Sequence, residues 1–429
     1  MTYEELYTLV KGEAVAIRGR AILEPAGGPN DKIFPPTHSV GDNETSPGAK
    51  YAFETRRIRG EKVECVLLDS VQSQANRMEE ALEALWAEKK LTLPVIEVDL
   101  SDAAPEVGKI TSLSAPHRVA DALLRDSLVV DNNGATFFRM SALGKSFTDA
   151  TLRKADSLFK VCPTGLLFGI WDSTGPKGGL GAKFARALAS EIVGVGVARG
   201  VKTESRIDPA GIVTGAATIY VSKDPVAAGC SWTYDWREAE PKDAAKELSE
   251  DNARKWGKTE KAGKPSAINH SNVPPTIDRV AGGVTIDYAE QTVVLSLAGL
   301  RRIGFTEGAW EARTALAALG LVAILAAEKR GYDLRSRCLL APRWNMEEKS
   351  SGSLKLEAVA ADGSTAPLTL DLDGAIRLYE DAVEKLPAAL KFETSAGIPL
   401  ATLKPSPKLE YLIRKSRELV VANEEIAEE

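Results

Sequence analysis

One stretch predicts the basic unit of the fold, a strand that leads into a helix: VLLDSVQSQANRMEEAL, residues Val66–Leu82. Its apolar start, within Val63–Leu68, is typical of a buried strand. After a polar corner, apolar residues recur at the spacing of one helix face: Ala75, Met78, Leu82, Leu85 and Trp86. They predict a helix over about 73–90. A strand that leads into a helix is the unit from which α+β and α/β domains are built.

Strand and helix patterns alternate along the rest of the chain, which favours an α+β core. Further strands are predicted at 14–23, 93–98, 166–171, 193–206, 216–222, 284–288 and 334–340. Further helices are predicted near 116–125, 149–158, 184–194, 291–302, 309–329 and 374–386. The IDPAG turn signal predicts that 193–206 and 216–222 form a protruding hairpin. The polar stretch from Arg237 to Lys264 is expected to be a mobile insertion.

The composition is that of a soluble globular protein. The 429 residues are 44% hydrophobic and 27% charged, which excludes disordered, collagen-like and coiled-coil classes. The four cysteines, Cys65, Cys162, Cys230 and Cys338, form no CxxC pair and indicate neither a zinc site nor a disulfide framework. The acidic start lacks a signal-peptide pattern, and the apolar run 315–327 is too short to span a bilayer. A cytoplasmic protein with a buried core helix and no membrane partner is expected.

The net charge of −6 argues at first against a nucleic-acid partner, but its distribution does not. Residues 347–429 hold 10 of the 54 basic and 16 of the 60 acidic side chains, which leaves 44 of each before them. The main body is therefore neutral and can carry basic patches.

Basic residues gather in three segments. The first holds Arg18 and Arg20, which share one face of a strand, and the second holds Arg56, Arg57 and Arg59. The third has these members: Lys177, Lys183, Arg186, Arg199, Lys202 and Arg206. Together they would line a groove for phosphates, whereas any one of them alone is more commonly a solvated surface.

Two segments offer polar groups for an anion. The corner before the predicted helix at 73–90 carries Ser70, Gln72, Ser73, Gln74, Asn76 and Arg77. It either binds an anion at the helix N-terminus or merely caps the helix. The glycine-rich loop Gly175–Gly181 fits neither the Walker pattern nor GxGxxG. It either contacts a nucleic-acid backbone or is a structural turn, with a nucleotide-binding enzyme as a weak third reading.

Enzymatic motifs are few. The histidines His38, His117 and His270 lie far apart and in no metal-binding or triad pattern. Aromatic residues make up only 6% of the chain, and no RNP1-like string is present, so base stacking on a sheet is not expected.

Four segments together resemble a known family: VLLDSVQSQANRMEEAL at 66–82, GIWDSTGPKGGLGAKFARALASEIVG at 169–194, TESRIDPAGI at 203–212 and NHSNVPPTID at 269–278. In this order they are similar to the CRISPR-associated RAMP backbone subunit of type I-G (formerly I-U) Cascade complexes. The resemblance spans about residues 14–345.

The resemblance implies an α+β fold, a modified RRM-like (ferredoxin-like) palm with inserted finger and thumb segments. The core is expected at 1–345, with a thumb hairpin at 199–222 and the mobile polar insertion at 237–275. Residues 346–429 are expected to form a small acidic C-terminal extension.

The resemblance also implies a non-catalytic subunit without a cofactor, stacked head to tail in several copies along CRISPR guide RNA. Its other partners would be target DNA, paired with the guide, a fused guide-processing and capping RAMP subunit, and a large subunit. The implied RNA contacts are Gln72, Ser73, Gln74, Asn76, Arg77, Lys177, Gly178, Gly179 and Lys183. The basic segments add Arg18, Arg20, Arg56, Arg57, Arg186, Lys202 and Arg206. The alternative is a metal-independent RNA endonuclease of RAMP type that uses one of the three histidines.

Overall fold

The structure of the chain is a computed structural model. It describes residues 1–38, 50–131, 134–172, 182–223, 232–239, 263–346 and 349–428, and the side chains of helix α12 up to residue 417. The chain divides into two compact units. The first comprises Met1–Gly200 and Gly283–Glu410, and the second comprises Val201–Gly282 and Tyr411–Glu429.

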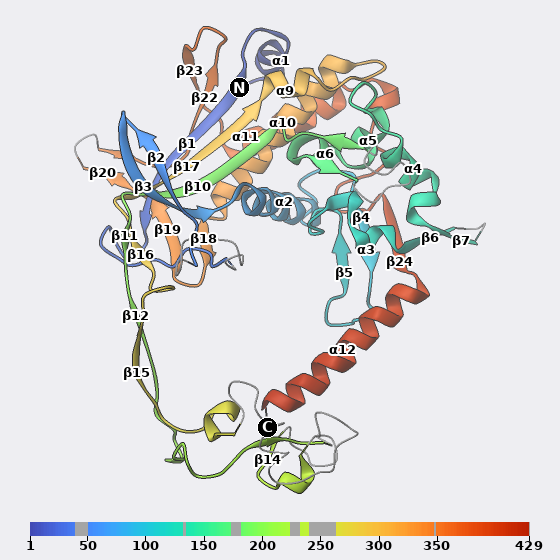
Figure 1. The fold of residues 1–429 in the computed structure, drawn as a ribbon. Helices are drawn as coiled ribbons and strands as arrows, with labels where there is room; N and C mark the ends of the chain where they lie inside the picture. Colours follow the sequence, from blue (N-terminus) through green and yellow to red (C-terminus); the bar gives the residue numbers. More distant parts are fainter. Residues whose placement is uncertain are drawn as a thin grey trace. The chain divides into compact units, whose positions relative to one another are not determined.

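A large antiparallel sheet organises the first unit (Figure 1). Within the described residues it has nine strands, and its main path runs in the order β18-β19-β1-β17-β10-β3-β2. β22 pairs with both β1 and β23. The bounds are β1 Ala16–Pro25, β2 Phe53–Ile58, β3 Glu61–Asp69, β10 Leu188–Val195, β17 Tyr288–Ser296, β18 Tyr332–Arg335, β19 Cys338–Pro342, β22 Lys355–Val359 and β23 Thr365–Leu368. In β1, Ile17, Ala21 and Leu23 are buried, as strict alternation requires.

Helices cover this sheet. α10, Ala309–Lys329, packs against β17, and α2, Val71–Ala87, packs against β10. α10 also contacts α1, Tyr3–Lys11, and α11, Leu372–Glu384. α10 is long and apolar enough to cross a membrane, but 78% of its most apolar 18-residue window is buried inside the fold. The predicted core helix is confirmed.

A second, five-stranded sheet belongs to the same unit, in the order β5-β4-β24-β6-β7. Its strands are β4 Ile96–Asp99, β5 Lys109–Thr111, β6 Ser127–Asp131, β7 Gly134–Phe137 and β24 Ala401–Pro405. Short helices accompany it: η1 Arg118–Ala120, α3 Ala122–Arg125, η2 Phe138–Met140, α4 Ala142–Thr148, α5 Asp156–Val161, α6 Pro163–Phe168 and η6 Ala388–Leu390. The remaining short elements are β8 Ile170–Trp171, β9 Lys183–Phe184, β11 Ala198–Arg199, β16 Val284–Thr285, α9 Leu297–Arg301, β20 Trp344–Asn345 and β21 Ser350–Ser351.

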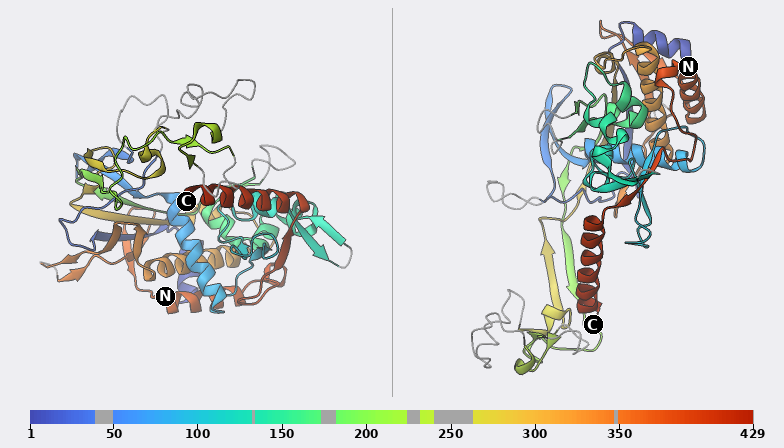
Figure 2. Two further views of the ribbon diagram at one scale, coloured as in Figure 1. Left: turned by 90° about the horizontal axis from the view of Figure 1, so that it is seen from below. Right: turned by 90° about the vertical axis from the view of Figure 1, so that its right-hand side faces the viewer.

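The second unit is built on one long strand pair. β12, Lys202–Arg206, and β15, Val273–Asp278, run antiparallel side by side (Figures 1 and 2). The unit also holds β13 Tyr220–Val221, β14 Trp232–Thr233, η4 Trp236–Glu238 and η5 Pro265–Ile268. Most of α12, Pro407–Glu428, is grouped with it.

The C-terminal part is not a separate extension, which corrects the predicted division at 346. β22 pairs with β1, β24 is inserted between β4 and β6, and α11 packs on α10. Residues up to Glu410 therefore complete both sheets and the core of the first unit. The acidic charge of this segment could not predict which strands it pairs with.

Three predicted elements are wrong. Residues 163–168 form a helix, because Pro163 stands in its first turn and Gly169, at φ +82°, ends it, which leaves only Ile170–Trp171 as strand. Residues 188–195 are a strand, so the helix predicted over 184–194 does not form. Residues 288–296 are also a strand, so of the helix predicted over 291–302 only α9, Leu297–Arg301, is helical. Leu188 and Ile192, four residues apart, share a face in a helix and in a strand alike, and the pattern could not separate the two.

The predicted hairpin of 199–222 also has a different partner strand. β12 pairs with β15, and the register joins Lys202 to Asp278 and Arg206 to Val273. β13, which lies in the predicted second strand, pairs with β14 instead. Turn signals report only local closure, so they cannot reveal a pairing between strands about 70 residues apart.

Candidate functional site

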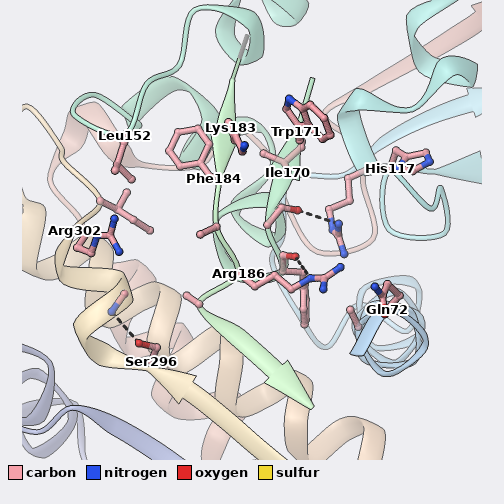
Figure 3. Close-up of a pocket in the computed structure, with 18 of the residues that line it drawn as sticks. Gln72, His117, Leu152, Ile170, Trp171, Lys183, Phe184, Arg186, Ser296 and Arg302 are labelled. Atoms are coloured by element: carbon pink, nitrogen blue, oxygen red, sulfur yellow. Dashed lines mark hydrogen bonds between the residues drawn. The ribbon is translucent and has the colours of Figure 1, made fainter. Parts of the chain in front are cut away.

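A cavity of about 1090 Å³ opens in the first unit, beside the strand-to-helix corner. Its wall combines the start of α2, the segment before η1, the end of α6 with β8, the segment 183–187 and α9. Figure 3 shows Gln72 on α2, Arg302 next to α9, and Lys183, Phe184 and Arg186 on the segment between them. The structure thus brings together two of the polar segments predicted from sequence.

The start of α2 presents its polar residues on two faces. Ser70 is the N-cap, and its hydroxyl accepts a hydrogen bond from the Ser73 backbone N–H at 3.2 Å. Gln72 and Asn76, one helical turn apart, are exposed and line the cavity. Ser73 is half-buried and lies outside the cavity wall. Capping therefore accounts for Ser70, while Gln72 and Asn76 are available to a ligand.

Gln74 faces the interior and requires a correction. Its side chain is 5% exposed and donates to Asp69 Oδ2 at 2.6 Å. Its Oε1 accepts from the Ser190 hydroxyl at 2.8 Å and from Gln291 at 3.0 Å. All three hydrogen bonds join strands of the main sheet to α2. Gln74 is a structural residue of this buried network, not a surface contact for RNA.

Arg77 has the same kind of role. Its Nε donates to the buried Asp69 carboxylate at 3.0 Å, and its terminal nitrogens donate to the backbone carbonyls of Asp333 and Leu334. Arg335 contacts the other Asp69 oxygen at 3.3 Å. Arg77 therefore ties α2 to β18, and its guanidinium is already satisfied by protein acceptors.

Three cations at the cavity have no carboxylate partner among the described residues: Lys183, Arg186 and Arg302. Arg186 is exposed, and its Nε donates to the Phe168 carbonyl at 3.0 Å. Desolvation, and then the nearby charge of Arg118, lower the pKa of Arg186. An anion placed here would relieve this repulsion between like charges.

A buried ion pair braces the cavity wall. Arg118 has φ +54° and forms a bidentate pair with Glu79, with both N–O distances 2.6 Å. Its Nη1 also donates to the Gly169 carbonyl at 3.1 Å, and its guanidinium lies 5.4 Å from the Phe168 ring centre. Burial raises the pKa of Glu79, an effect that the Arg118 charge opposes. Arg118 therefore connects η1 to α2 and to the residue before β8. Because its guanidinium is already bound by these protein groups, it is not free for a ligand.

The basic residues of β1 and β2 lie elsewhere on the sheet and are not in the cavity. Arg18 pairs with Glu357, and Arg20 pairs with Glu290. Arg56 pairs with Glu54 and Glu191, and hydrogen bonding to Glu191 raises the pKa of Arg56. Arg57 donates to the Gly60 carbonyl at 3.4 Å, in the turn after β2. Neither of these two segments lines the cavity that Lys183 and Arg186 face.

Lys202 and Arg206 belong to the second unit. Lys202 pairs with Glu204 at 2.7 Å and with Asp278 at 3.4 Å across the β12–β15 pair. Arg206 donates to the carbonyls of His270 and Ser271 at 2.9 and 3.1 Å. Both side chains stabilise the strand pair on which they stand.

The glycine-rich loop falls outside the described residues, and with it Lys177, Gly178 and Gly179. The segment that follows it is β9 and β10, not a helix. A phosphate site at a helix N-terminus, on which the nucleotide-binding reading rested, is therefore not formed there.

Sequence reasoning missed two residues of the cavity. Arg302 follows α9, in a segment predicted as a continuous helix, and no motif singled it out. Trp171 on β8 is 58% exposed, and a lone tryptophan carries no pattern that indicates exposure. Their proximity to α2 depends on the pairing of β8 with β9 and of β10 with β17.

The chemistry of the site is that of an anion binder. His117 lines the cavity, but His38 lies elsewhere and His270 is in the second unit, next to Asp208 at 3.3 Å. Within the described part of the chain no three His, Cys, Asp or Glu side chains are grouped to hold a metal ion. Unpaired cations, amides and one exposed aromatic ring suit phosphate and base groups.

Comparison with known proteins gives one family. Residues 17–199 match the family described as CRISPR-associated protein GSU0053. The matched stretch is less than half of the chain and contains every segment of the cavity wall except α9 with the residues around it. No curated protein matches the chain.

Proposed function

We propose that the chain is a CRISPR-associated protein of the GSU0053 family, which its residues 17–199 match, and that it is the guide-RNA-binding backbone subunit of a type I-G Cascade complex. In this role it is non-catalytic and cytoplasmic. Copies stack head to tail on the guide RNA, hold its phosphates and leave bases free to pair with target DNA. The fused guide-processing and capping subunit and the large subunit complete the complex.

The topology of the main sheet supports an RRM-like palm. β1, α2, β10, β17, α10 and β19 follow one another in the order of a β-α-β-β-α-β unit. Their four strands are neighbours in the sheet, in the order β19-β1-β17-β10. The other elements are inserted or appended: β2 and β3 lie between β1 and α2, strands β4 to β7 with their helices lie between α2 and β10, and β12 to β15 lie between β10 and β17. α1 precedes β1, and the elements from β20 to α12 follow β19.

The second unit is the candidate thumb. Its strands β12 and β15 leave from and return to the segment between β10 and β17. Ile207, directly after β12, is 85% exposed, and Ile277 on β15 is 62% exposed. Exposed apolar side chains of this kind can wedge between bases. We place the thumb on the β12–β15 pair, in place of the hairpin expected at 199–222.

The single observation that carries the proposal is the cavity. Lys183, Arg186 and Arg302 lack a carboxylate partner among the described residues, and they face a space that Gln72 and Asn76 also line. Cations held apart from acids are available to phosphates, and binding through the backbone has no sequence preference. A guide carrier needs this property, because base pairing supplies the specificity.

The test is co-expression with a CRISPR array and the partner subunits. The wild-type protein is expected to purify as an assembly that contains RNA. A variant with Lys183, Arg186 and Arg302 changed to Ala should bind guide RNA more weakly for every spacer. The slope of log K against log salt should become shallower by about 1–2, because each lost phosphate contact on a single strand removes roughly 0.7.

The matched control removes two cations that are already paired, Arg18→Ala with Arg20→Ala. This variant should keep the wild-type affinity and salt slope. Recovery of the wild-type protein as an RNA-free monomer would refute the backbone role. An unchanged slope in the triple variant would refute the cavity as the RNA site.

One observation favours a second candidate, a metal-independent RNA endonuclease: His117 is exposed in the same basic cavity. A histidine beside phosphate-binding cations can act as a general acid or base. Incubation of precursor RNA with the pure protein in a chelator tests this. Cleavage that disappears in His117→Ala, but not in His38→Ala, would replace the non-catalytic role.

A further inference from the structure

Trp171 is exposed where a tryptophan is expected to be buried. Its side chain is 58% exposed on the two-residue strand β8 and lines the cavity. The aromatic side chains Phe168 and Phe184, on the same wall, are 1% and 4% exposed and pack in the core. Among the described Phe, Tyr and Trp residues of the cavity wall, Trp171 is thus the one whose ring is open to a ligand.

A cation is already held at this ring. Lys183 lies opposite Trp171 in the β8–β9 pair, and its Nζ is 5.2 Å from the ring centre. Figure 3 shows the two side chains next to each other at one end of the cavity. The contact holds one positive charge against the ring. The ring remains 58% exposed in spite of it.

Other polar groups suit the rest of a nucleotide. Arg186 stands three residues beyond Lys183, so the two Cα atoms are at most about 11 Å apart along an extended chain. Gln72 and Asn76 carry amides with both donors and acceptors, which base edges require. A volume of about 1090 Å³ exceeds what one nucleotide needs.

We infer that the cavity is a single-nucleotide site in which Trp171 stacks one unpaired base of the bound RNA while Lys183 and Arg186 hold its phosphate. The inference rests on the proposed RNA-binding function and adds a base contact to it. Stacking on one aromatic ring tolerates every base, so it is compatible with guides of any sequence.

The test uses a short single-stranded RNA with one 2-aminopurine, a base whose fluorescence is quenched on stacking. The wild-type protein should quench it at one position of the bound strand. Trp171→Ala should abolish the quenching and weaken binding about tenfold. Trp171→Phe should retain part of both effects, because a smaller ring still stacks.

Trp344→Ala is the matched control. Trp344 is 55% exposed on β20, in the same unit, and does not line the cavity. It should leave affinity and quenching unchanged. Since both tryptophans are exposed, circular dichroism melts of both variants should overlay the wild-type curve, which separates loss of stacking from loss of folding.

The outcomes separate the two proposals. If the wild-type protein binds RNA and Trp171→Ala binds it equally well with equal quenching, the stacking site is wrong and the RNA-binding function stands. If the wild-type protein binds no RNA, the proposed function fails. If AMP alone binds and Trp171→Ala abolishes that binding while RNA does not compete, the site accepts free nucleotides, and the inference is overturned.

Discussion

Two groups of basic side chains in the first unit differ in their partners. Arg18, Arg20 and Arg56, on the strands of the main sheet, are each paired with a glutamate. Lys183, Arg186 and Arg302, at the cavity, have no such partner among the described residues. In the sequence the two groups look alike. The difference shows that a local count of charges does not locate a phosphate site, because an ion pair removes a cation from binding.

The largest effect is expected at the buried pair that supports the cavity. Glu79→Ala leaves Arg118 buried without a counter-charge and should lower the free energy of unfolding by about 3–5 kcal/mol, measured by urea denaturation. Glu88→Ala, at the C-cap of the same helix and in an exposed pair with Lys90, is the control. If the two variants unfold at the same urea concentration, the pair does not brace the wall.

An intermediate effect should separate two neighbouring glutamines of α2. Gln74→Ala breaks the buried hydrogen bonds to Asp69 and Ser190 and should cost about 1–3 kcal/mol of stability. Gln72→Ala should change stability by less than about 0.5 kcal/mol but weaken RNA binding. Thermal melts and filter binding on the same samples give both values. The reverse pattern would show that the faces of α2 are wrongly assigned.

The smallest effect is expected for the paired surface cations. Arg18→Ala removes a partly exposed pair with Glu357 and should cost only about 0–1 kcal/mol. Its affinity for guide RNA should match the wild type at every salt concentration, whereas Lys183→Ala should bind more weakly at low salt. A salt-dependent loss in Arg18→Ala would mean that RNA competes with Glu357 for this side chain.

Much of the fold followed from local patterns. Alternation placed Arg18 and Arg20 on one face of β1, and the apolar stripe of α2 is buried as expected from Ala75, Met78 and Leu82. α10 has the predicted bounds of Ala309–Lys329. These patterns are reliable because the apolar residues of a buried face recur at the repeat of the helix or strand that carries them.

The candidate site was predicted only in part. Gln72, Asn76, Lys183 and Arg186 do meet at one cavity, but Gln74 and Arg77 were included with them by adjacency alone. The next residue along a helix turns by about 100°, so neighbours in sequence face different surroundings. Which of them faces Asp69 and which faces the cavity depends on where α2 packs on the sheet.

The sequence by itself determined the amphipathic elements, the polar corner and the neutral charge of the main body. The tertiary structure decided the pairing of β12 with β15, the strand state of 188–195, the place of β24 between β4 and β6, and the partner of each cation. The reason is physical. Periodicity is a property of neighbouring residues, whereas strand pairing and ion pairing join residues far apart in the chain, and only the closed fold selects among the possible partners.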